Sequence, residues 1–338
     1  MNPFCHYFRT IKAYFNKHIP MRNLYPITQP SFSGTIEVGQ GHKIYAEESG
    51  NPKGIPIVFL HGGPGSGCKP DHRQFFDPEK YRVFLFDQRG AGRSTPKGDI
   101  ENNTTWLLLD DLERIRQHFK VEKWVLFGGS WGATLALLYA EAHATRVLGC
   151  VLRGSFLARA ADMSWFFGDG AQRLLPQSWE RFSKECAGHR KGLELAKHLY
   201  SGLLGTDQEE TARVAKAWDT WSAAVVMFSM NSEPAGGMMG DLQTAISRAR
   251  IEMHYAVNSY FIEENHILNH ISQFPSVPTH IIHGGRDITC LPEAGWQLHK
   301  AIVGSTFEVL RTGGHLSGEK ELTDALIRAT DNLAEMLA

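Results

Sequence analysis

The sequence has no long hydrophobic run, few cysteines and almost no net charge, and each of these absences argues against a class of protein. No apolar stretch reaches the roughly 18 residues that a membrane-spanning helix needs. The five cysteines are scattered and none forms a Cys-x-x-Cys pair, so we expect reduced thiols, as in the cytoplasm. The 35 basic residues nearly balance the 36 acidic ones, which gives no reason to expect nucleic acid or an anionic membrane as a partner.

Residues 1–20 contain three basic residues and no acid, and they lack a continuous apolar segment. A signal peptide is therefore not expected. A transit peptide stays open, although the segment has no serine. We favour an N-terminal extension over residues 1–20, ahead of a start at Met21. A chain of 338 residues is long enough for one large domain or for a domain with a substantial insertion.

Short apolar runs rich in β-forming residues alternate with helical patterns along both ends of the chain. A mostly parallel sheet covered by helices on both faces, an α/β architecture, is predicted by this alternation. The expected elements are a hairpin over 35–47, strands over 56–60, 81–87, 147–153, 279–284 and 305–310, and a helix over 106–119.

The pattern changes between residues 155 and 270, where the sequence is helical, rich in tryptophan and arginine, and free of β-runs. Segments 178–200 and 241–261 have the periodicity of amphipathic helices, and 231–240 is typical of a flexible loop. We therefore expect the N-terminal extension (1–20), a first part of the core (21–154), an inserted helical cap (155–270) and a second part of the core (271–338).

The segment from Lys123 to Gly132 carries the clearest chemical signal. An apolar strand, KWVLF, leads into Gly128-Gly-Ser130-Trp-Gly132, and an apolar helical run follows. A serine at such a sharp strand-to-helix turn needs small neighbours, and the helix directs its N-terminal N–H groups to where an oxyanion would form. A glycine-rich turn around an ordinary serine would fit the same five positions. With the residues described next, the segment predicts the nucleophile elbow of the α/β-hydrolase fold, with Ser130 as nucleophile.

A serine nucleophile needs a base, and the base needs an orienting carboxylate. In this fold they follow the serine in the order Asp, His, each in a loop after a late strand. Asp287 follows the strand expected over 279–284, and His315 follows the one expected over 305–310. We predict that Ser130, Asp287 and His315 form the catalytic triad.

The oxyanion hole requires two backbone N–H groups. The strand over 56–60 ends in His-Gly62-Gly63-Pro64-Gly, where glycines allow close approach of an N–H to a carbonyl oxygen and Pro64 restricts the loop. We assign the hole to the N–H groups of Gly63 and Trp131, with Gly62 as the alternative.

No cofactor is expected, because these groups together carry out acyl transfer through an acyl-enzyme. The pair His266 and His270 has helical spacing but neither an HExxH motif nor a third ligand nearby in the sequence, so no metal site is expected.

Several motifs together resemble the proline iminopeptidases, also called prolyl aminopeptidases. They are HGGPGSGC, FDQRGAGRSTP, NNTTW, GGSWG, LRGSF and RDITCLP, and the likeness runs from about Met21 to the C-terminus. The resemblance implies a serine exopeptidase that removes an N-terminal proline from a small peptide with a free N-terminus. Its catalytic residues fall on Ser130, Asp287 and His315. In DQRG, Asp87 and Arg89 are expected to be structural.

The resemblance also implies residues that bind the substrate. In the family, a carboxylate in the motif R-I-E, here Glu252, binds the substrate amine. The implied pocket walls are Phe156, Phe166 or Phe167, and Cys290.

The sequence departs from the family pattern at two places. The second family carboxylate, after W-x-x-W, is replaced by Ser222, and an aromatic wall residue is replaced by Ala256. Asp219 or Glu263 could take over the role of the lost acid. The departures leave open an esterase or amidase that needs no free amine. A non-catalytic binding protein is disfavoured, because the triad and the elbow are intact.

Overall fold

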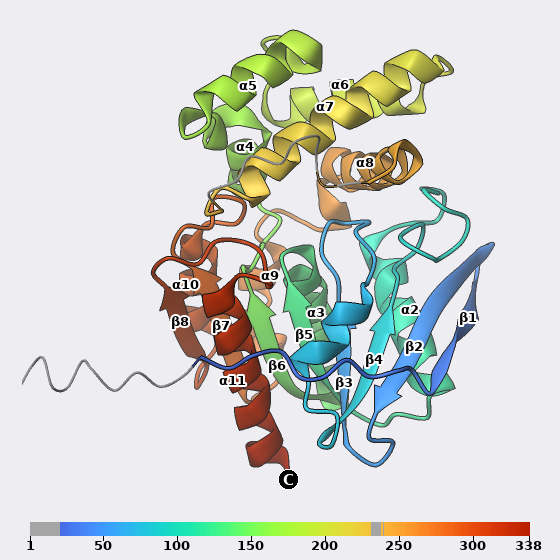
Figure 1. Ribbon diagram of the computed structural model, residues 1–338, viewed down its shortest axis with the longest axis vertical. Coiled ribbons are helices and arrows are strands. Elements are labelled where there is room, and N and C mark those ends of the chain that lie inside the picture. The colour runs from blue at the N-terminus through green and yellow to red at the C-terminus, as the bar shows by residue number, and fades with distance from the viewer. Residues whose placement is uncertain (1–20, 231–237, 239) are drawn as a thin grey trace, which may run out of the picture.

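The computed structural model describes residues 21–230, 238 and 240–338 (Figure 1). The N-terminal extension and the greater part of the loop predicted over 231–240 lie outside the described residues.

The centre of the molecule is an eight-stranded sheet with the order β1-β2-β4-β3-β5-β6-β7-β8. β1 pairs antiparallel with β2, and β2 with β4, whereas all later pairs are parallel. The hairpin is confirmed as β1 and β2, and the other predicted strands coincide with β3 to β8 within two residues. The bounds are β1 Phe32–Gly39, β2 His42–Gly50, β3 Ile55–Leu60, β4 Tyr81–Phe86, β5 Trp124–Gly129, β6 Val147–Arg153, β7 Thr279–Gly284 and β8 Thr306–Leu310.

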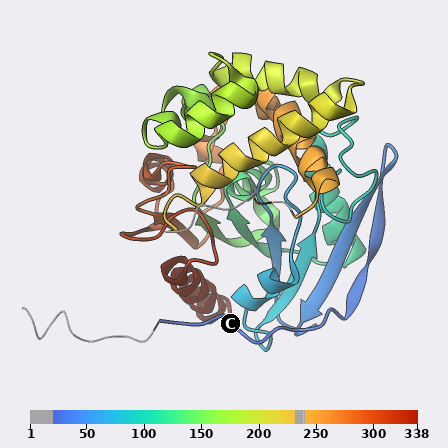
Figure 2. The ribbon, with the colours of Figure 1, turned by 45° about the horizontal axis from the view of Figure 1, so that its top comes forward.

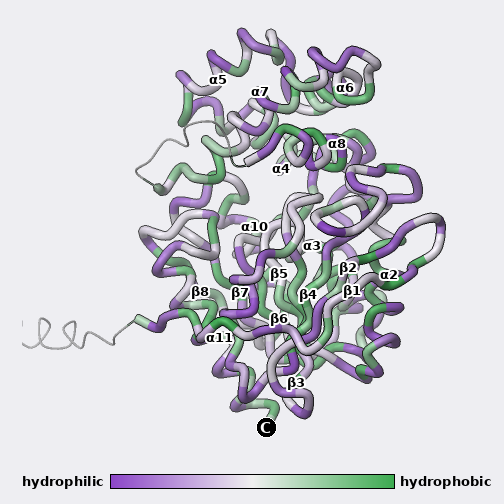
Figure 3. The backbone as a smooth tube through the Cα atoms, turned by 45° about the vertical axis from the view of Figure 1, so that its right-hand side comes forward, coloured by the Kyte–Doolittle hydropathy of each residue, from purple (hydrophilic) through white to green (hydrophobic). Residues whose placement is uncertain are grey.

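Helices cover both faces of this sheet, as the α/β prediction requires. Consecutive side chains of β3 enter opposite cores: Val58 and Leu60 join one apolar cluster, and Ile57 and Phe59 join the other. The central strand β5 is buried along its whole length, and hydrophobic segments run through the sheet in the tube coloured by hydropathy (Figure 3). The first face is covered by α2 (Thr105–His118), α3 (Trp131–Ala142) and α10 (Pro292–Ala301), the second by α11 (Lys320–Leu337) and the turn Pro70–Phe75.

A helical layer lies between β6 and β7 in the sequence and above one end of the sheet in space (Figures 1 and 2). Its helices α5 to α7 surround a separate apolar cluster, to which α8 also contributes. The segment 178–200 forms two helices, because the chain turns at Gly188, whose φ is 58°. Its helices are α4 Ala160–Ser164, α5 Pro176–Phe182, α6 Gly192–Leu204, α7 Gln208–Val226 and α8 Leu242–Val257, with short turns at Trp165–Asp169, Ala171–Arg173, Ser183–Ala187 and Ser259–Phe261. The following helix α9, His266–Asn269, and the turn Ile271–Gln273 pack against α3 of the sheet domain.

Helix α8 joins this layer to the sheet domain. Its residues Ile251 and Tyr255 belong to the apolar cluster that also contains α2 and α3. The Tyr255 hydroxyl donates to Asn103 Oδ1 at 2.9 Å, and Thr105 Oγ1 donates to the carbonyl of Tyr260 at 2.5 Å. These contacts fix α8 and the turn after it to the core.

Among the described residues, no helix is long and apolar enough to cross a membrane. The four described cysteines are free thiols.

Candidate active site

Ser130 lies in the turn between β5 and α3. Its backbone has φ 57° and ψ −125°, a conformation that L-residues rarely adopt, and its N–H donates to the carbonyl of Arg153 at 3.0 Å. A Cβ atom at Gly128 would lie 2.2 Å from the carbonyl oxygen of Gly132, and one at Gly132 would lie 2.0 Å from that of Leu60. The two glycines therefore let β3, β5 and α3 approach closely enough to form the turn.

Asp287 and His315 lie side by side in the loops after β7 and β8. The Asp287 Oδ2 atom is 2.7 Å from Nδ1 of His315, and its Oδ1 accepts from the N–H groups of Thr289 and Cys290, each at 2.9 Å. Burial opposes ionisation of Asp287, but the neighbouring His315 and these hydrogen bonds hold its pKa below the usual value. The carboxylate can therefore orient the imidazole and stabilise its protonated form.

Ser130 and His315 line the same cavity, but neither is the other's hydrogen-bond partner in this structure. Ser130 Oγ lies 3.8 Å from Cys290 Sγ, and His315 Nε2 lies 3.4 Å from Nη1 of Arg153. The same Nη1 donates to the His315 carbonyl at 2.6 Å. Proton transfer requires Ser130 Oγ and His315 Nε2 to come within hydrogen-bond distance, and catalytic hydrogen bonds commonly shorten only when substrate binds.

The glycine loop after β3 lies against the elbow. Gly62 and Gly63 line the cavity with Ser130, and Trp131 is the first residue of α3, where N–H groups have no partner within the helix. Gln88 holds the two segments together: its Nε2 donates to the His61 carbonyl at 2.9 Å, and its Oε1 accepts from Trp131 Nε1 at 2.9 Å.

His61 completes this network. Its Nε2 accepts from the N–H of Gln88 at 2.9 Å, and burial lowers the pKa of the imidazole, which favours the neutral ring. Sequence reasoning missed Gln88. Its position within the DQRG motif was the available signal.

The cavity has a volume of about 240 Å³, near the small end of ligand pockets. It is enclosed by the elbow, the glycine loop and the helical layer. The predicted residues that line it are Gly62, Gly63, Ser130, Phe156, Phe166, Phe167, Ser222, Glu252, Cys290 and His315. Asp287 lies behind His315, outside the lining.

Glu252 is 9% exposed and is held by two donors. Trp218 Nε1 donates to its Oε2 at 2.6 Å, and Nε of Arg248 donates to its Oε1 at 2.8 Å. Sequence reasoning missed both partners. Arg248 stands four residues before Glu252 on α8, a spacing that places two side chains on one face of a helix, so this ion pair could have been found.

The two departures from the family pattern lie in different surroundings. Ser222 lines the cavity. Ala256 is 2% exposed and belongs to the apolar cluster of α5 to α7, outside the cavity lining. Tyr260, which sequence reasoning missed, lines the cavity, and its ring lies 5.0 Å from that of Phe156.

The charged residues of the DQRG segment, Asp87 and Arg89, are buried and form ion pairs outside the cavity lining. Arg89 donates to both carboxylate oxygens of Asp111, at 2.6 and 2.8 Å, and Asp87 accepts from Nε of Arg93 at 2.8 Å. These contacts fix the loop beside the elbow.

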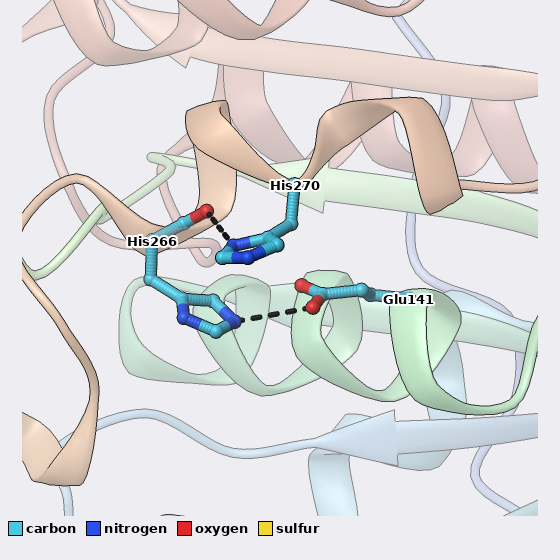
Figure 4. Close-up of side chains that lie close together, drawn as sticks. All are labelled: Glu141, His266 and His270. Atoms are coloured by element: carbon cyan, nitrogen blue, oxygen red, sulfur yellow. Dashed lines mark hydrogen bonds and ion pairs between the residues drawn. The ribbon is translucent and has the colours of Figure 1, made fainter.

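His266 and His270 lie together with Glu141 of α3 (Figure 4), and none of the three lines the cavity. Nε2 of His266 is 3.1 Å from Oε1 of Glu141, and Nδ1 of His270 is 2.9 Å from the carbonyl of His266. Glu141 provides the third ligand type that the histidine pair lacks in the sequence, and the three could hold a divalent cation. Glu141 and His266 are 125 residues apart in the sequence, so no local pattern indicates that they are in contact.

Residues 55–322 match the family of the α/β hydrolase fold, the class that the sheet and the elbow define. A probable proline iminopeptidase from Leptolyngbya boryana is 42% identical over 92% of this chain and 97% of that protein. The proline iminopeptidase of Xanthomonas citri is 42% identical over 93% of this chain and all of its own. The chain belongs to the proline iminopeptidase family. An esterase from Exiguobacterium antarcticum, 21% identical, has a similar fold, with a TM-score of 0.60 over 89% of this chain and 99% of its own.

Proposed function

We propose that this protein is a serine aminopeptidase that releases N-terminal proline, or a related small residue, from short peptides. The observation that carries the proposal is the 2.7 Å contact between Asp287 and His315 beside Ser130, in a cavity that also contains the carboxylate of Glu252. Membership of the proline iminopeptidase family supports the choice of substrate.

The reaction proceeds by acyl transfer. His315 takes the proton of the Ser130 hydroxyl as its oxygen attacks the carbonyl of the first peptide bond, and Asp287 stabilises the imidazolium. His315 then gives the proton to the leaving amine. Water activated by His315 hydrolyses the acyl-enzyme and releases the free amino acid. Side chains and backbone of this chain supply every step, without a metal or cofactor.

The N–H groups of Gly63 and Trp131 stabilise the tetrahedral oxyanion, with Gly62 as the alternative to Gly63. Both glycines line the cavity, and the N–H of Trp131 stands at the start of α3. The positive end of this helix dipole adds to the stabilisation.

The substrate's N-terminal residue occupies the part of the cavity next to the helical layer. Glu252 binds its amine, because a largely buried carboxylate is a strong acceptor for a charged N–H group. Phe156, Phe166 and Cys290 form walls that suit an apolar ring. The free thiols of the four described cysteines support action in the cytoplasm.

The test compares kcat/KM for the p-nitroanilides of proline and N-acetylproline, with alanine anilide as a control for size. An aminopeptidase cleaves the free prolyl compound and discriminates strongly against the acetylated one. Equal rates on both would replace the proposal with an esterase or amidase that does not need an amine.

A further inference from the structure

Arg248 has a buried hydrogen-bond donor without an acceptor, next to the residue that binds the substrate amine. The side chain lines the cavity and is 9% exposed. Its Nε is paired with Glu252 at 2.8 Å. Its Nη1 is buried and has no hydrogen-bond partner among the residues that the structure describes.

An unsatisfied guanidinium N–H is unfavourable in a protein interior, so buried polar groups nearly always have a partner. The guanidinium of arginine has five N–H donors and no acceptor. Because the Arg248 side chain lines the cavity, an oxygen of a bound ligand that reaches the guanidinium would supply the acceptor that the described residues do not.

The charge of the cavity also favours an acceptor on the ligand. Among the described lining residues Glu252 is the one carboxylate, whereas Lys69, Arg153 and Arg248 are cations. Glu252 is already paired with Arg248, and Ser222 beside them is neutral. A cationic amine gains less from a paired carboxylate than from a free one. A neutral group that offers both an N–H and a nearby oxygen would match the Glu252–Arg248 pair.

We propose that Arg248 binds a carbonyl oxygen on the N-terminal residue of the substrate, and that the cavity accepts a 5-oxoprolyl group. This γ-lactam has the five-membered ring of proline, with a carbonyl next to the ring nitrogen. The lactam N–H donates to Glu252, and the lactam oxygen accepts from Nη1 of Arg248. The proposal rests on the acyl-transfer site described above and extends its substrates from proline to the neutral lactam.

The chemistry at the peptide bond stays the same. Ser130 Oγ forms an ester with the peptide carbonyl of the 5-oxoprolyl residue, not with its lactam carbonyl. The C–N bond to the next residue breaks, and His315 protonates the leaving amine. One water molecule then cleaves the ester, which gives 5-oxoproline and the shortened peptide. The lactam ring remains closed.

The experiment measures kcat/KM of the wild-type enzyme and of Arg248→Met on the aminomethylcoumarin amides of 5-oxoproline and proline. Methionine keeps much of the length of the side chain but cannot donate. The readout is kcat/KM on each substrate and their ratio, which a loss of folded enzyme leaves unchanged. Loss of a hydrogen bond from a charged donor should lower cleavage of the 5-oxoprolyl amide by roughly ten- to a hundred-fold. A ratio lowered only by faster prolyl cleavage, as the freed Glu252 would give, would contradict the proposal.

Arg250→Met is the matched control. Arg250 lies on the same helix, and its Nε donates to the carbonyl of Leu203 at 2.9 Å, outside the cavity lining. This variant should leave the ratio of the two rates unchanged. If Arg248→Met does not fold, competitive inhibition of the wild-type enzyme by 5-oxoprolinamide, compared with prolinamide, tests lactam binding directly.

The outcomes separate the two proposals. Cleavage of the prolyl amide without cleavage of the 5-oxoprolyl amide or inhibition by the lactam would overturn the role of Arg248 and leave the aminopeptidase standing. The same holds if Arg248→Met has the wild-type ratio. Cleavage of the 5-oxoprolyl amide alone, with kcat/KM on that amide lowered in Arg248→Met but not in Arg250→Met, would support the lactam subsite and refute the aminopeptidase. Cleavage of neither substrate and no inhibition would refute both.

Discussion

Replacing Ser130 with glycine and with alanine separates the chemistry of the nucleophile from the conformational strain of its turn. Both variants lack the hydroxyl, so both should lose turnover of the prolyl anilide by a factor on the order of 10⁶, as when other serine hydrolases lose their nucleophile. They differ in stability, because Ser130 has φ 57° and ψ −125°. Alanine must keep this conformation with a Cβ atom, whereas glycine has none.

The expected difference follows from two opposing contributions. A non-glycine residue in such a conformation costs about 1–3 kcal/mol. Glycine costs about 0.5–1 kcal/mol in the entropy of the unfolded chain. Ser130→Gly should therefore be more stable than Ser130→Ala by up to about 2.5 kcal/mol. For 338 residues the entropy of unfolding is roughly 0.7 kcal/mol per kelvin, so this difference shifts Tm by at most about 3–4 °C.

Equilibrium unfolding in urea, followed by tryptophan fluorescence, resolves such a difference better than a thermal midpoint does. The control is Ala133→Gly in the following helix α3, where the backbone is helical and glycine should lower the free energy of unfolding by at least about 0.5–1 kcal/mol. If Ser130→Gly proves no more stable than Ser130→Ala, the elbow stores no strain and this reasoning is wrong.

Three further predictions concern the substrate amine, the triad and pH. Glu252→Gln should lower kcat/KM on prolyl anilide about ten- to a hundred-fold, and much less on a neutral ester such as phenyl acetate; equal losses would remove Glu252 from amine binding. Asp287→Asn should lower kcat on prolyl anilide by about 10⁴-fold, because the imidazole loses its orienting carboxylate; a variant with near wild-type turnover would exclude Asp287 from the triad. Burial lowers the pKa of His72 from 6.5 to about 3, so the unfolded chain binds a proton below pH 6.5 that the folded protein refuses, and stability falls with pH in that window. His72→Gln removes this contribution. Between pH 7 and pH 5 the free energy of unfolding of the wild type, measured in urea, should therefore fall by up to about 2 kcal/mol more than that of the variant. An equal fall in both proteins would contradict the assignment.

The sheet and the elbow could be predicted because their signals are local. A strand buried on both faces is a short apolar run, and β5 to β7 are such runs. The order of Ser130, Asp287 and His315 adds a constraint of the fold, in which loops after parallel strands meet at one edge.

Contacts between distant side chains could not be predicted in the same way. Gln88 reaches the glycine loop and Trp131 through one amide group, and nothing in its sequence neighbourhood indicates both partners. Glu141 meets His266 only because α3 and α9 pack together. The division of the segment 178–200 depends on the left-handed backbone of Gly188, which helical periodicity does not report.

Helix α8 explains how the site combines fixed catalytic geometry with variable selectivity. Its Tyr255 ring lies 5.2 Å from the ring of Trp131, and the Tyr260 ring after it lies 5.4 Å from the same indole. The residue that follows the nucleophile therefore packs directly against the helix that carries Glu252 and Arg248. These buried aromatic contacts tie the recognition residues to the nucleophile from the side of the core, and Trp218 of α7, which donates to Glu252, holds them from the side of the helical layer. A single side chain on the cavity face of α8 can then change which acyl group binds, as we propose for Arg248, without displacing the carbonyl from Ser130.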